Sequence, residues 1–259
     1  MSATAGTSRH RQAAVGAATG FVGFLLLWEG VVALFHMSPL VLPSPPDVAR
    51  TLASLLTTRD FWVNFETSLT EFAVGFVLAT TTGIAVGITM ALVPRIRMLA
   101  DPLLDATRFI VPFSLVPLAA LWFGISDVGK IFIVWYSMFF VIVLNTSAAI
   151  ENIDPLLLRA AAMLRLNFWT RLRFVLVPAS TRRILIGLRI AVALGWIAVI
   201  AAEYIASRHG LGFMITQAAL GLETPTVIAG MVVIGAVGGA LSAALELLTR
   251  RLVPWEQRV

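Results

Sequence analysis

The sequence predicts an all-α, polytopic membrane protein with six transmembrane helices. Of its 259 residues, 59% are hydrophobic and only 13% are charged, and the mean hydropathy is +0.91. A soluble domain of this length would not cover so much apolar surface, so we expect much of that surface to face lipid. The apolar runs are long enough to cross a bilayer as helices, and short segments that contain arginine separate them.

The first division of the chain, residues 1–63, combines a polar tail, a first span and an outer amphipathic helix. The apolar run at residues 13–35 has a cleaved signal peptide as its alternative interpretation. This run is longer than a signal h-region and no A-x-A site follows it, which favours a transmembrane helix. Ser44-Pro45-Pro46-Asp47 is typical of a capped helix start, and we expect a short helix from there to about Leu56 on the outer surface.

The second division, residues 64–248, holds the remaining five spans. The second span, residues 64–93, carries Gly75, Gly83 and Gly87, which are small enough for close helix contact. The third span, residues 101–122, contains Pro112 and Pro117, which we expect to kink it. Backbone groups freed inside a membrane must be buried or must line a cavity, so both prolines are candidates for a translocation path.

Spans four to six follow the same pattern of apolar runs between turns. They are predicted at residues 130–150, 184–205 and 226–248. Gly187, Ala191 and Gly195 recur every four residues and give the fifth span a flat face for packing. A tight turn at residues 123–129 precedes span four, and an outer loop at residues 206–225 precedes span six. The third division, residues 249–259, is a polar tail.

The distribution of basic residues orients these spans. Thirteen lie in the segments on one side of the six-span arrangement, and four lie on or near the other side. Short cytoplasmic loops carry an excess of Lys and Arg, so both termini and the loop at residues 151–179 are predicted to be cytoplasmic. The net charge of +5 follows from these loop arginines, and we therefore expect no nucleic-acid partner.

The loop at residues 151–179 is amphipathic and rich in arginine. Asp154 suits an N-cap and Pro155 suits the first helical position. Asn167 is expected to cap a second helix, which Pro178 then closes. The first helix presents a small apolar face at helical spacing: Leu157, Ala160, Ala161 and Leu164. Such a loop either rests its arginines on lipid headgroups or docks on another protein, and its physical pattern alone leaves both alternatives open.

The sequence contains no motif that is typical of an enzyme active site. The sequence contains no P-loop, no HExxH, no clustered metal-ligand spacing and no Ser-His-Asp arrangement, and it contains no cysteine. We therefore expect no catalytic residue, no metal site and no cofactor in the chain itself. Energy for transport must then come from a partner or from an ion gradient.

Ionisable residues within the spans have two interpretations. Asp105 and Arg108 can pair at i,i+3, and others can pair or reach toward an interface. Alternatively, Glu71 and Glu203 line the translocation route. The alternative function is an ion-coupled secondary transporter, which would show inverted repeats that this sequence does not display.

A family resemblance bears on the loop. Ala160-Ala161, the position of Arg165 and the closing Val177-Pro178-Ala179 resemble the "EAA" loop in the membrane subunits of bacterial ABC importers. The resemblance implies coupling helices that dock in a cleft of a cytoplasmic ATPase. Two positions depart from the family pattern: Arg159 replaces the usual Glu, and Arg165 replaces the usual Gly. A glycine at position 165 would permit a left-handed turn between the two helices. The ATPase-coupling residues implied are Arg159, Ala160, Ala161, Leu164, Arg165, Leu166 and Asn167.

The resemblance covers most of the chain and is to the sulfonate, taurine and nitrate group of these permeases. The matching segments are LPSPPDV at 42–48, LADPLL at 99–104, LWFGIS at 121–126, GLRIA at 187–191, AAE at 201–203 and RRLVPW at 250–255. It implies a type I ABC importer permease in the bacterial inner membrane. The implied partners are a second copy, two ATPase subunits that bind ATP and Mg, and an extracytoplasmic binding protein.

The substrate expectation rests on the same resemblance. Arg159, the GLGFM stretch at 210–214 and the RRLVPW tail look most like the taurine branch. Taurine or another aliphatic sulfonate is therefore the expected solute. Nitrate, bicarbonate and vitamin precursors are the alternatives within the same class of importer.

Overall fold

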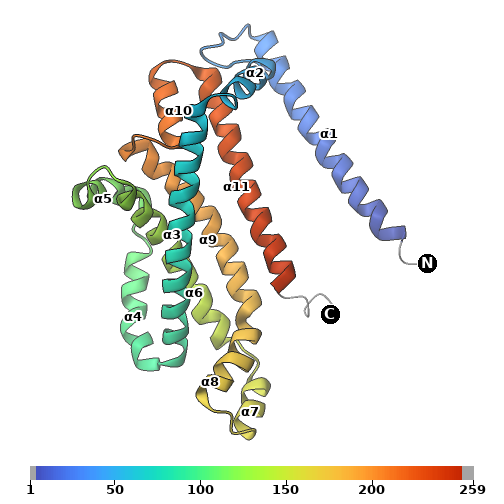
Figure 1. Ribbon diagram of the computed structural model, residues 1–259. Coiled ribbons are helices and arrows are strands. Elements are labelled where there is room, and N and C mark those ends of the chain that lie inside the picture. The colour runs from blue at the N-terminus through green and yellow to red at the C-terminus, as the bar shows by residue number, and fades with distance from the viewer. Residues whose placement is uncertain (1–3, 253–259) are drawn as a thin grey trace. The chain divides into compact units, whose positions relative to one another are not determined.

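The structure is a computed structural model that describes residues 4–252 (Figure 1). Every regular element within these residues is a helix, which confirms the all-α prediction. Residues 253–259, which include most of the predicted tail, lie outside the described residues. The helices are α1 Thr4–Leu34, α2 Pro45–Leu55, α3 Arg59–Leu92, α4 Pro94–Thr107, η1 Pro112–Leu115, α5 Val116–Phe123, α6 Asp127–Glu151, α7 Pro155–Met163, α8 Phe168–Arg171, η2 Leu172–Leu176, α9 Val177–Ala206, α10 Leu211–Leu220 and α11 Thr224–Leu252.

The described chain divides into two compact units. The first holds residues 4–61 and 215–233, and the second holds residues 62–214 and 234–252. In the first unit, the predicted cap of α2 is present: the backbone N–H of Asp47 donates to the Ser44 hydroxyl at 3.3 Å, and that hydroxyl donates to the Asp47 carboxylate at 2.6 Å. The Thr224 hydroxyl donates to the Leu40 carbonyl at 2.6 Å, which ties the start of α11 to the segment before α2.

The second unit is built around α6. Ile133, Val134, Met138, Ile142 and Val143 of this helix are completely buried. Small residues let the neighbouring helices approach it closely, as the sequence predicted. Five glycines of α3 and α9 lie so close to α6 that an added Cβ would collide with one of its side chains: Gly75 with Val134, Gly83 with Ile142, Gly87 with Thr146, Gly187 with Asn145 and Gly195 with Met138.

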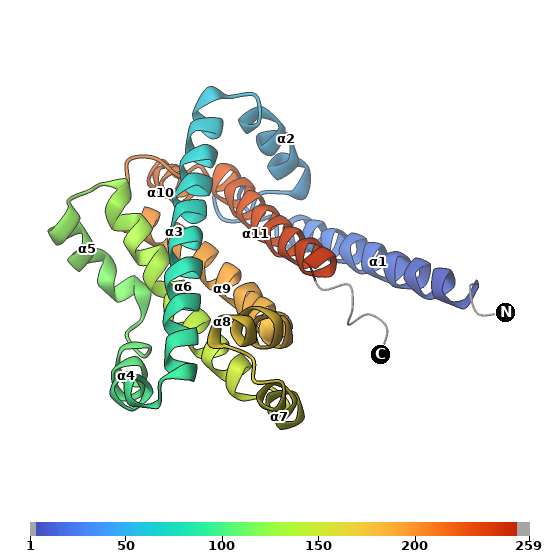
Figure 2. The ribbon, with the colours of Figure 1, turned by 60° about the horizontal axis from the view of Figure 1, so that its bottom comes forward.

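These contacts also fix the directions of the helices. From Gly75 to Gly87 along α3, the contacted residue of α6 moves forward from Val134 to Thr146, so these two helices are parallel. From Gly187 to Gly195 along α9, the contacted residue of α6 moves back from Asn145 to Met138, so α9 is antiparallel to both. Trp196 donates to the Ile234 carbonyl at 3.0 Å and Arg189 pairs with Glu246 at 3.0 Å, so α9 and the later part of α11 are antiparallel. Because α3 and α6 are parallel, the segment between them must return the chain to the starting end. Figure 2 shows α4 and α5 in this returning segment.

The returning segment is a broken helix pair. Its two halves, Pro94–Thr107 and Pro112–Phe123, meet at an angle of 84°. Val111 is extended, as expected for a residue before proline, and Pro112 starts the second half. The prediction that Pro117 also kinks the chain was wrong: Val116 is helical and Pro117 lies in the first turn of α5, where its missing N–H is not needed.

Fewer helices of the structure are long and apolar enough to span a membrane than the six that the sequence predicted. Among the described residues, four helices are long and apolar enough to cross a membrane, and the broken pair makes a fifth. The predicted first span is helical from Thr4 to Leu34, but its apolar part, Thr19–Leu34, is shorter than the other spans. The six-span count is therefore not confirmed, although five of the predicted spans correspond to helices or to the broken pair.

Two features of the second half of the chain differ from the prediction. Pro178 does not close the second loop helix, because α8, η2 and α9 form one continuous helix, Phe168–Ala206. A π-turn at Leu172–Leu176 precedes the proline, and its wider spacing leaves room for a ring that cannot donate a hydrogen bond. The predicted outer loop at residues 206–225 contains the ten-residue helix α10.

Candidate translocation cavity and docking loop

A cavity of about 680 Å³ lies at the break between α4 and α5. Residues 108–113 of the break form one side, and α6 and α9 form the rest, from Tyr136 to Leu144 and from Leu194 to Ala201. Pro112, one of the four predicted path residues, lines this cavity. The other three predicted path residues, Pro117, Glu71 and Glu203, are not among the residues that line it.

The break leaves polar groups at the cavity wall. The Tyr136 hydroxyl donates to the Thr107 carbonyl at 2.7 Å, which satisfies one acceptor at the end of α4. Arg108 pairs with Asp105 at 3.2 Å, which confirms the i,i+3 pairing, and its guanidinium lies 5.0 Å from the centre of the Phe109 ring. Of all the residues that line the cavity, Arg108 alone carries a charge.

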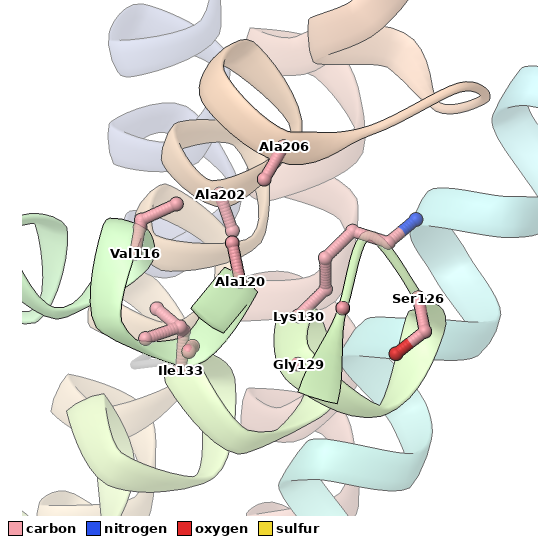
Figure 3. Close-up of a pocket in the computed structure, with 10 residues that line it drawn as sticks. Val116, Ala120, Ser126, Gly129, Lys130, Ile133, Ala202 and Ala206 are labelled. Carbon is pink, nitrogen blue, oxygen red and sulfur yellow. The ribbon is translucent and has the colours of Figure 1, made fainter. Parts of the chain in front are cut away.

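Glu71 belongs to a buried ion-pair cluster between α3 and α6. Its carboxylate pairs with Lys130, and the exposed fractions of the two side chains are 2% and 5%. The Lys130 ammonium also pairs with Asp127 at 3.0 Å and donates to the Ser207 hydroxyl at 3.0 Å. Figure 3 shows Lys130 beside a small cavity, with its nitrogen directed toward α3. The contacts of Glu71 therefore support its interpretation as a paired structural residue.

Glu203 is buried in a second polar cluster that joins α9, α10 and α3. One of its oxygens accepts from the Ser68 hydroxyl at 2.5 Å, and the other accepts from the Gly212 N–H at 2.7 Å. The Leu211 N–H donates to the Ser68 hydroxyl at 2.8 Å, and the Gly210 N–H donates to the Asn64 side chain at 2.7 Å. The first N–H groups of α10 are thus satisfied by side chains, and the negative carboxylate lies at the favourable end of the helix dipole.

The loop between α6 and α9 has both predicted caps. The Asp154 carboxylate accepts from the Leu156 N–H at 2.8 Å, and the Asn167 side chain accepts from the Thr170 N–H at 2.8 Å. Between the two helices Arg165 has a φ of 48°, in the left-handed region. The turn that a glycine would make without strain is therefore present with an arginine in its place.

The face that this loop offers differs from the predicted one. Ala161 is 4% exposed, so it packs inside the chain and is not available to a partner. Ala160 is exposed, and large apolar side chains are exposed around it. We call this set the docking face: Leu156, Leu157, Ala160, Met163, Leu164, Phe168 and Trp169. The side chains of Phe168 and Trp169 extend the face onto the second helix, which the sequence analysis did not include.

The left-handed turn gives a stability prediction. Arg165→Gly should raise the free energy of unfolding by about 0.5 kcal/mol, because relief of roughly 1 kcal/mol of backbone strain exceeds the added entropy of the unfolded chain. Arg159→Gly is the matched control, since Arg159 is exposed within α7. The control should lose about 1 kcal/mol. Thermal unfolding of both purified variants in detergent would test this, and equal losses would contradict the assigned turn.

The comparisons with known proteins agree with this architecture. The family described as "Binding-protein-dependent transport system inner membrane component" matches residues 83–258. The taurine transport system permease protein TauC of Escherichia coli is 35% identical over 240 residues, which are 91% of this chain and 87% of TauC. The bicarbonate transport system permease protein CmpB of Synechococcus elongatus is 33% identical over 253 residues, 92% of this chain and 86% of CmpB.

A solved structure shows the same fold. It is an inward-facing conformation of the MetNI methionine ABC transporter, with a TM-score of 0.64 at 16% sequence identity. The match covers 76% of this chain and 95% of the chain in that structure. The family match spans well over half of the sequence and includes the broken pair, α6, the loop and α9. This chain belongs to the family of inner membrane components of binding-protein-dependent transport systems, the permease subunits of ABC importers.

Proposed function

We propose that this chain forms the membrane path for taurine or another small aliphatic sulfonate in an ATP-driven importer. Two copies form the path, two cytoplasmic ATPase subunits bind beneath it, and an extracytoplasmic binding protein delivers the solute. The chain itself hydrolyses no ATP, since its sequence has no P-loop to hold phosphates. The identity to the taurine permease supports the substrate, and the similar identity to a bicarbonate permease makes bicarbonate the alternative.

The docking face carries the coupling part of this proposal. Leu164 is 72% exposed, and Met163 and Trp169 are more than two-thirds exposed beside it. A contiguous apolar face of this kind marks a protein or membrane contact. The two capped helices hold the face in one shape, which suits a cleft in a partner protein. Docking of Ala160 and Leu164 in the ATPase, with Arg159, Arg165, Leu166 and Asn167 around them, would transmit nucleotide-driven closure to the continuous helix Phe168–Ala206.

A tryptophan substitution distinguishes a docking face from a lipid-resting helix. Ala160→Trp should abolish taurine-stimulated ATP hydrolysis in proteoliposomes that contain the chain, its ATPase and its binding protein, because a matched cleft has no room for the added ring. A helix resting on lipid would tolerate tryptophan, which favours the membrane interface. Ala162→Trp is the matched control, because Ala162 is exposed on the opposite side of α7. The control should retain stimulation.

The outcomes separate the parts of the proposal. Normal stimulation in Ala160→Trp would show that this face does not bind the ATPase. Stimulation of the wild-type protein by bicarbonate or nitrate but not by taurine would reassign the solute within the same importer class. Solute uptake that needs no ATP and follows a proton gradient would overturn the importer mechanism in favour of secondary transport.

A further inference from the structure

Arg108 is placed where a fixed charge has no evident structural purpose. Arg108 lies at the break between Pro94–Thr107 and Pro112–Phe123, two helices that together are long and apolar enough to form one membrane span. Tyr136, which contacts the end of α4, lies near the middle of α6, a helix of 25 residues. Both positions place Arg108 deep in the membrane-spanning part of the second unit. A charged side chain at such a depth has to face a polar cavity or a paired group.

The pair that Arg108 forms is open. The side chains of Arg108 and Asp105 are 43% and 59% exposed, unlike the buried pair of Lys130 and Glu71. Asp105 lies on the same helix one turn earlier, so this pair joins no two elements of the fold. Removal of the pair would therefore leave the packing between helices unchanged. Arg108 is also one of the residues that line the 680 Å³ cavity, and the rest of the lining is aromatic or aliphatic apart from the hydroxyl-bearing Tyr136 and Ser137.

We infer that Arg108 binds the anionic group of the solute as it crosses the cavity at the break. A guanidinium presents a planar set of donors that matches the oxygens of a sulfonate or other oxyanion. Phe109 stacks beside it and limits its orientation. The solute anion takes the place of Asp105 during passage, and the return of Asp105 releases it. This inference rests on the proposed import of an anionic or zwitterionic solute and identifies the group in the permease that recognises its charge.

Three variants separate anion binding from a structural ion pair. Arg108→Gln should lower taurine uptake in proteoliposomes by about tenfold or more, from the loss of a charge-assisted hydrogen bond. Arg108→Lys should recover part of the uptake, because it restores the charge without the planar fork. The double variant Arg108→Gln/Asp105→Asn is decisive. Loss of a structural pair would be repaired by neutralising both partners, whereas loss of an anion site would not.

Controls make each outcome informative. Arg250→Gln removes an exposed arginine that pairs at i,i+4 with Glu246, outside the cavity, and should transport as the wild type does. Wild-type uptake in the double variant, with the complex intact by size-exclusion chromatography, would overturn the inference. A defect seen only in vesicles that contain anionic lipid would assign Arg108 to a lipid headgroup instead. Absence of any anion uptake by the wild-type importer would refute the proposed function, which is a separate result.

Discussion

Lys130→Met will lower the free energy of unfolding by about 3–5 kcal/mol, because it leaves the Glu71 carboxylate buried without its counter-charge. Both side chains are almost completely inaccessible, and the ammonium also holds the Ser207 hydroxyl at the end of α9. The variant therefore loses the ion pair between α3 and α6 and the hydrogen bond to the chain that follows α9. An SDS titration in mixed micelles, followed by circular dichroism, would measure the change.

A paired variant tests the cause. Glu71→Gln/Lys130→Met removes both charges with little change in volume and should recover most of the lost stability. Asp127→Asn is the control within the same cluster: Asp127 is 73% exposed, so its pair with Lys130 should contribute less than about 1 kcal/mol. If Lys130→Met and Asp127→Asn had equal effects, burial of the Glu71 charge would not be the source of the loss.

Local features of this fold were predictable from the sequence. The caps at Ser44, Asp154 and Asn167 depend on residues at most three positions away, and all three are present. The close-packing glycines were also predictable, since a repeat of small residues on an apolar helix indicates a contact face. The family resemblance made a left-handed turn at Arg165 one of two alternatives, the other being a helix that continues through it, and the structure has Arg165 at a φ of 48°.

Features that depend on distant partners were not predictable. In the sequence, Lys130 was only a charged residue at the start of the fourth span. In the structure it pairs with Glu71 of α3, and the broken helix pair lies between these two residues in the sequence. The helix α10 was missed because it is short and lacks an amphipathic repeat. Ala161 was placed on the apolar face of the first loop helix by helical spacing and by the family resemblance, and neither reveals which side of a surface helix its own chain covers.

The second large effect is expected at Gly210, beside the other buried carboxylate. Its φ is +123°, a conformation that residues with a side chain rarely adopt, and an added Cβ would overlap the carboxyl group of Glu203. Gly210→Ala should therefore displace Glu203 from Ser68 and from the Gly212 N–H. The strain and the lost hydrogen bonds together should lower the free energy of unfolding by about 3 kcal/mol or more.

A double-mutant cycle shows whether the carboxyl group is the cause. In a Glu203→Ala background the collision is absent, so Gly210→Ala should lower stability only by the backbone strain, about 1–3 kcal/mol. Gly235→Ala is the matched control, because a Cβ at that position of α11 meets no atom within 4 Å, and it should be neutral or slightly stabilising. Additive losses from Gly210→Ala and Glu203→Ala would mean that the glycine does not make room for the carboxylate. Strong coupling between them would show that Gly210, Glu203 and the start of α10 form one unit that fixes α10 to α3 and α9.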